Sequence, residues 1–86
     1  MKITLEISMY PLKDEYIPAI DDFIAALNAV DGLKVETSAT STLVLGDYEP
    51  VMKLLGDAIA QSYERYGVSV FVAKIIPGYD PQAQTA

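Results

Sequence analysis

Residues 3–10 alternate between apolar and polar side chains without a break, and this pattern constrains the fold more than any other. The apolar positions are Ile3, Leu5, Ile7 and Met9, and the polar positions are Thr4, Glu6, Ser8 and Tyr10. Because successive side chains of a strand point to opposite faces, a period of two predicts a β-strand with one face on a hydrophobic core. The polar side chains must then lie together on the opposite face.

Five further elements follow this strand. Apolar residues recur every three or four positions over residues 16–30 and 47–66, which predicts two amphipathic helices. Pro18 suits the first turn of the first helix, and Asp47 is a candidate N-cap of the second. Shorter apolar stretches predict strands over residues 33–38, around 42–45 and over 68–76.

This order of elements, β-α-β-β-α-β, predicts an α+β fold of the ferredoxin-like type. Two split β-α-β units with right-handed crossovers give a four-stranded antiparallel sheet in the spatial order 4-1-3-2, with both helices on one face. The first and third strands are then central. A chain of 86 residues forms one domain, which we expect over residues 1–78, and we expect the polar tail, 79–86, to be disordered.

The face of the sheet without helices carries the polar side chains of the first strand. Such faces are often simply solvated. Here, however, the fourth strand is apolar on both sides, with Val72 on one and Phe71 on the other, and the third strand has Leu43 on one side and Val44 on the other. Whichever side is covered, apolar residues remain on the open face, so we expect it to pack against a second copy in a homodimer or higher homo-oligomer.

Composition excludes several classes of function. The chain has no cysteine and no histidine, which excludes a disulfide, a thiolate or imidazole metal site, and catalysis by histidine. Its net charge of −6 lacks the positive field on which nucleic-acid binding relies. No apolar run is long enough to span a bilayer, and the residues after Met1 do not resemble a signal peptide. We therefore expect a cytoplasmic protein that is not an enzyme, needs no cofactor, and neither binds nucleic acid nor inserts into a membrane.

Two stretches resemble motifs of a known family. The first is Ser8-x-Tyr10-Pro11-Leu12. The second is Val35-x-Thr37 followed by Ser41-Thr42-x-x-x-Gly46, with the next helix at Val51-Met52. In order and spacing they resemble the YkoF-like family, the thiamine/hydroxymethylpyrimidine-binding domain, and the related small thiamine-binding proteins.

The resemblance implies a domain that binds thiamine or its hydroxymethylpyrimidine precursor without catalysis, in thiamine salvage or transport. In two-domain members, two such folds pack sheet against sheet, so this single copy would have to dimerise. The matching positions are Ser8, Tyr10, Thr37, Ser41, Thr42 and Gly46. We expect Ser8 to bond a pyrimidine nitrogen and Tyr10 to stack on the ring or close its edge. We expect one of Ser41 and Thr42 to share the open face with the polar residues of the first strand. Thr37 is explained as well by β-propensity at a strand end, and we expect Gly46 to be structural.

Glu6 lies outside these motifs, and its chemistry makes it a further candidate ligand residue. A carboxylate accepts a hydrogen bond from the exocyclic amine of an aminopyrimidine, or balances a thiazolium charge. A solvated carboxylate on an open sheet is an equally good explanation. Two other functions stay open: a sensor of another small molecule, and a dimerisation module without a ligand. The dimerisation module requires that Glu6, Ser8 and Tyr10 satisfy one another without a ligand.

Overall fold

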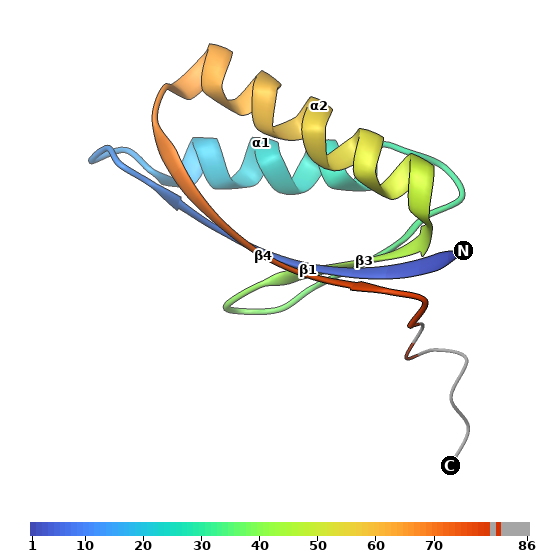
Figure 1. Ribbon diagram of the computed structural model, residues 1–86. Helices are drawn as coiled ribbons and strands as arrows, with labels where there is room; N and C mark the ends of the chain where they lie inside the picture. The colour runs from blue at the N-terminus through green and yellow to red at the C-terminus, as the bar shows by residue number, and fades with distance from the viewer. Residues whose placement is uncertain (80, 82–86) are drawn as a thin grey trace.

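The computed structural model describes residues 1–79 and 81. Its elements follow the predicted order (Figure 1). They are β1 (Lys2–Pro11), α1 (Ile17–Asn28), β2 (Lys34–Thr37), β3 (Thr42–Asp47), α2 (Tyr48–Tyr66) and β4 (Ser69–Pro77). The strands form one antiparallel sheet in the order β2-β3-β1-β4, which is the predicted order 4-1-3-2. The predicted α+β fold and its topology are confirmed.

The hydrophobic core lies between the sheet and the two helices, which cover the same face (Figure 1). Ile3, Leu5 and Ile7 of β1 are at most 2% exposed, as the alternation predicts. They pack with Phe23 and Leu27 of α1. The cluster also contains Val44, Val51, Leu54, Leu55 and Ala58. Each of these side chains larger than alanine stabilises the fold by about 1.5–3 kcal/mol when it leaves water, so this burial holds β1 with its polar residues on the outside.

The ends of the helices differ in detail from the prediction. The first helix ends at Asn28, and Gly32, with a φ of 87°, turns the chain toward β2. Asp47 occupies the N-cap position of α2, but its side chain makes no capping hydrogen bond. It lies directly opposite Lys2 in the sheet, and its carboxylate is 3.3 Å from the Lys2 ammonium group. Among the described residues, no helix is both long and apolar enough to cross a bilayer.

The register of the strands decides which residues share the open face. Leu5 is opposite both Val44 and Ile75, so these residues face the helices. Glu6 is opposite Leu43 and Lys74, so these face outward. The open face therefore carries Lys34, Glu36, Leu43, Leu45, Val70, Val72, Lys74 and Ile76 beside the polar residues of β1. Of the alternatives left by the sequence, Leu43 and Val72 lie on the open face.

Candidate functional site

The Glu6 carboxylate lies at the centre of the polar groups on the open face. Its Oε2 accepts a hydrogen bond from the Ser41 hydroxyl at 3.3 Å, and its Oε1 is 3.5 Å from Lys74 Nζ. The Glu6 side chain is 39% exposed. An ion pair this exposed contributes at most about 1 kcal/mol to stability. These contacts therefore orient the carboxylate and leave it accessible.

Ser8, two residues further along β1, is tied to the connection between β2 and β3. Its hydroxyl donates to the Thr40 carbonyl at 2.9 Å. The connection is itself closed by Ser38, whose backbone N–H and hydroxyl both donate to the Ser41 carbonyl, at 2.8 and 3.1 Å. Short hydroxyl side chains favour turns through local bonds of this kind. In this connection, the hydrogen bonds of Ser8 and Ser38 position Ser41 beside Glu6.

Thr37 and Thr42 lie on the other face of the sheet. They are opposite each other in the β2–β3 register, and their hydroxyl oxygens are 3.3 Å apart. Thr42 is buried toward the helices. Of the consecutive residues Ser41 and Thr42, only one can share the open face, because side chains alternate. That residue is Ser41.

Two depressions adjoin the β2–β3 end of the sheet. One, of about 260 Å³, is lined by Glu6, Glu36, Thr37, Ser38, Ser41 and Leu43. The other, of about 150 Å³, reaches α1 and is lined in part by Ser8, Phe23, Ile24, Thr37, Ser41 and Thr42. Thr37 and Ser41 belong to both. Five of the six predicted ligand residues are thus gathered at one end of the sheet, on its two faces, and their role as ligand residues stays a prediction.

Tyr10, the sixth predicted residue, lines neither depression. It is exposed on the open face, opposite Val70 of β4. Sequence reasoning missed Lys74, which contacts Glu6. Lys74 is the one charged residue of β4, and its two-residue spacing from Val72 is the signal that would have placed it on the same face.

The far end of the open face is covered by the chain itself. The Thr4 hydroxyl donates to the Tyr79 carbonyl at 2.7 Å, and the Gly78 N–H donates to the Lys2 carbonyl at 2.7 Å. The chain thus turns back at the end of β4, and Thr4 and Leu45 are only 4% exposed. Of the predicted tail, 79–86, all residues except 79 and 81 lie outside the described residues. At this end the two central strands are therefore covered, while Lys34 and Ile76 on the outer strands stay exposed; along the central strand β1, the accessible part is the end with Glu6, Ser8 and Tyr10.

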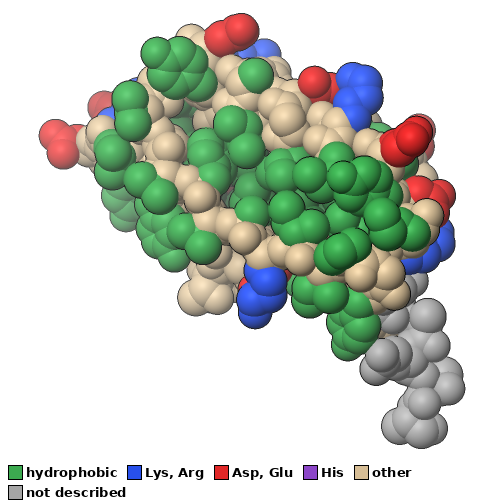
Figure 2. Space-filling view, in the orientation of Figure 1, with side chains coloured by type: hydrophobic (Ala, Val, Ile, Leu, Met, Phe, Trp, Pro, Cys, Tyr) green, Lys and Arg blue, Asp and Glu red, His purple; other side chains and the backbone are tan. Residues whose placement is uncertain are grey.

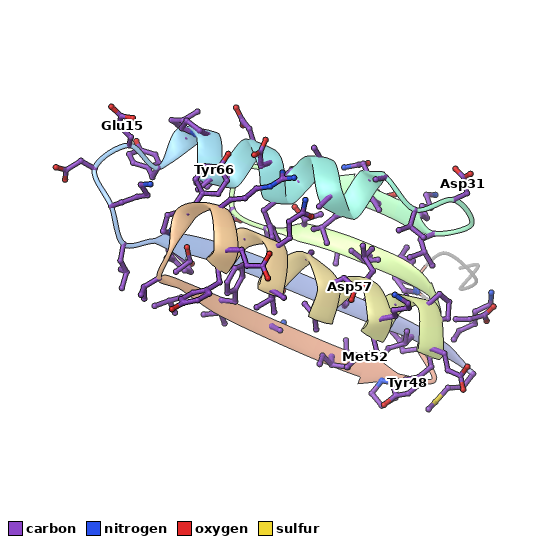
Figure 3. The ribbon with its side chains drawn as sticks, turned by 90° about the horizontal axis from the view of Figure 1, so that it is seen from above. Glu15, Asp31, Tyr48, Met52, Asp57 and Tyr66 are labelled. Atoms are coloured by element: carbon purple, nitrogen blue, oxygen red, sulfur yellow. The ribbon has the colours of Figure 1, made fainter. Side chains whose placement is uncertain are left out.

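A second polar cluster joins the two helices on the opposite side of the molecule. Figure 3 shows Tyr66 between α1 and α2. Its hydroxyl donates to the Asp22 carboxylate, and Arg65 Nη1 lies 3.7 Å from the same carboxylate. This hydrogen bond, with burial and the negative charge of Asp22, raises the pKa of Tyr66. The cluster connects the helices and does not reach the open face. In the part of the chain that the structure describes, no group of acidic residues is arranged to hold a metal ion.

Comparison with known proteins identifies solved structures of the same fold. No protein-family model and no curated protein matches the chain. A Streptococcus pneumoniae protein matches with a TM-score of 0.85 and 21% identity, over 96% of this chain and 92% of that one. A hypothetical protein of Methanocaldococcus jannaschii matches with a TM-score of 0.78 and 27% identity, over 92% and 82%. A proposed thiamine biosynthesis/salvage protein of Thermotoga maritima matches with a TM-score of 0.80 and 22% identity, over 99% and 90%.

Proposed function

We propose that the protein binds thiamine or its hydroxymethylpyrimidine precursor, without catalysis, at the Glu6 end of the open face in a homodimer. One observation carries the proposal: an accessible carboxylate on a central strand is oriented by Ser41 on a face that also carries the apolar side chains of Leu43 and Val72. The likeness to the proposed thiamine biosynthesis/salvage protein of Thermotoga maritima supports the ligand class. The resemblance of the Ser8 and Ser41 motifs to the YkoF-like family supports it as well.

The chemistry of these side chains suits an aminopyrimidine. Its exocyclic amine donates hydrogen bonds, and its ring nitrogens accept them. The Glu6 carboxylate accepts, and the hydroxyls of Ser8 and Ser41 can rotate to donate to a ring nitrogen. The thiazolium of thiamine would add a positive charge close to Glu6, which is favourable for a chain with a net charge of −6.

A second sheet over the open face would close the site. Facing sheets pack about 10 Å apart, so their side chains normally fill the space between them. Leu43 and Val72 supply apolar contact for such packing, whereas Ser8 and Ser41 are short. A flat ring fits where the side chains are short, and the apolar contacts around it exclude water.

Isothermal titration calorimetry with thiamine and with hydroxymethylpyrimidine tests the proposal. We expect Glu6→Gln to weaken binding by about 5–12-fold, because the glutamine amide oxygen still accepts a hydrogen bond and only the charge-dependent part, about 1–1.5 kcal/mol, is lost. Glu64→Gln, the same change at an exposed position of α2, is the matched control and should bind like the wild type. A folded protein that releases no heat with either compound would refute the proposal. Unchanged affinity in Glu6→Gln would remove Glu6 from the site.

A second candidate, a dimerisation module without a ligand, is favoured by one observation. Both Glu6 and Ser8 already have hydrogen-bond partners in their own chain, Ser41 and Thr40. Neither residue therefore needs a ligand to satisfy its polar atoms. A null result in the titration, from a protein that still self-associates, would support this function.

A further inference from the structure

β4 forms one edge of the sheet, and no strand among the described residues pairs with its outer side. The opposite edge, β2, has only four residues, of which Lys34 and Glu36 are charged. β4 has nine residues and one charge, Lys74. Edge strands are usually protected from pairing by shortness, charge or a covering segment. β2 has two of these protections, and β4 has none of them along most of its length.

Two hydrogen bonds establish which backbone groups of β4 point outward. At one end of the β1–β4 ladder, the Gly78 N–H donates to the Lys2 carbonyl. Near the other end, the Leu12 N–H donates to the Val68 carbonyl. The even-numbered residues of β4 therefore exchange backbone hydrogen bonds with β1. Backbone groups alternate in direction along a strand, so the N–H groups of the odd-numbered residues point the other way. The residues whose N–H groups point away from β1 are Ser69, Phe71, Ala73 and Ile75.

The side chains of β4 are apolar and accessible on both faces of the sheet. Val70 and Val72 on the open face are 46% and 57% exposed, and Ile75 on the helix face is 41% exposed. Figure 2 shows hydrophobic side chains gathered on the side of the molecule where β4 and α2 lie. An exposed apolar surface that surrounds a row of unpaired backbone groups is typical of a strand that pairs with another chain.

We propose that the outer edge of β4 pairs antiparallel with β4 of a second copy of this chain, joining the two four-stranded sheets into one continuous sheet. A pairing of identical strands must obey two-fold symmetry. A register centred on Ala73 uses the whole strand and puts Phe71 opposite the partner's Ile75. The two Lys74 side chains then do not face each other. The smallest side chain of the strand interior lies at the symmetry axis, where the two copies approach most closely.

A second copy fits this edge better than another kind of partner. The edge requires a partner strand that is long and apolar on both faces and carries no cluster of charge. β4 itself meets this requirement, and β2 does not. The pairing also extends the open face, so two joined sheets would present a larger surface for face-to-face packing. The pairing itself does not use Glu6, Ser8 or Ser41, because it is made by the outward backbone groups of β4, whose residues Phe71, Ala73 and Ile75 direct their side chains to the helix face.

Hydrogen exchange of the ligand-free protein, measured residue by residue by NMR, tests the pairing. We expect the amides of Phe71, Ala73 and Ile75 to exchange about 100-fold or more slowly than exposed amides, although β1, their one neighbouring strand among the described residues, does not bond them. The amides of Val72 and Lys74, which point toward β1, are an internal control and should be protected in either case. Fast exchange at Phe71, Ala73 and Ile75 beside slow exchange at the two control amides would overturn the proposal.

A proline substitution tests the same pairing by mass. Ala73→Pro removes an outward N–H and leaves the hydrogen bonds to β1 in place. In analytical ultracentrifugation we expect it to halve the mass of the assembly, whereas Ala73→Thr, which retains the N–H, should keep the wild-type mass. A monomeric wild type, or a folded Ala73→Pro variant of wild-type mass, would overturn the pairing. If Ala73→Pro fails to fold, the exchange measurement decides. If the exchange and the ultracentrifugation results are as expected but the wild-type protein does not bind thiamine or hydroxymethylpyrimidine, only the proposed function is refuted.

Discussion

Gly46 offers a sharp test of how the sheet packs on the helices. It lies opposite Ile3 on the helix-facing side of β3. A Cβ atom at this position would be 2.4 Å from Leu33 Cδ2 and 3.5 Å from Val51 Cγ2. The second distance is an ordinary contact, but the first is far too short. In Gly46→Ala, therefore, the methyl group of Leu33 has to move.

The expected cost follows from this single contact. Overpacking a core by a methyl group costs about 1–3 kcal/mol, and alanine recovers about 0.5–1 kcal/mol because it restricts the unfolded chain more than glycine does. We expect Gly46→Ala to lower the free energy of unfolding by up to about 2.5 kcal/mol, instead of raising it as an unobstructed alanine would. In a Leu33→Ala background the obstructing methyl group is gone. There the same substitution should be neutral or slightly stabilising, a coupling of about 1 kcal/mol or more.

Urea unfolding at one fixed protomer concentration measures all four members of this double-mutant cycle. Gly56→Ala is the matched control, because a Cβ at Gly56 in α2 would meet nothing within 4 Å. It should stabilise the protein by about 0.5–1 kcal/mol through helix propensity alone. Strict additivity of Gly46→Ala and Leu33→Ala would refute the packing explanation. Stabilisation by Gly46→Ala equal to that of the control would refute it as well.

Two other hydrogen bonds lead to stability predictions. Tyr66→Phe should destabilise the protein at neutral pH, because phenylalanine has no hydroxyl to donate to the Asp22 carboxylate. The pKa of Tyr66 is raised in the folded state, so this stabilisation is complete below a pH of about 10 and is lost as the pH rises through the raised pKa. Urea midpoints of wild type and variant should therefore converge at alkaline pH, and a constant difference would contradict this. Thr4→Val leaves the Tyr79 carbonyl without its donor and should cost about 1–2 kcal/mol in urea unfolding; an unchanged midpoint would show that this bond contributes nothing.

Local patterns in the sequence determined the architecture and half of the site. The strict alternation of residues 3–10 required β1 to bury one face, and it therefore put Glu6 and Ser8 together on the other. The two helical periods and their spacing between strands left one common topology for the sheet. These features follow from the geometry of single elements, because burial of an apolar face depends on periodicity within the element alone.

Only the tertiary structure decided which groups meet across the strands. The sequence showed that one of Ser41 and Thr42 shares the open face, but the register with β1 selects Ser41 and turns Thr42 toward the helices. The same register brings Lys74 to Glu6 from a strand almost seventy positions away in the chain. Asp47 bonds Lys2 instead of capping its own helix because the sheet sets the two opposite each other. Register is a long-range property: a shift of one residue changes every face, and only the packing of the whole sheet against both helices makes one register more stable than its neighbours.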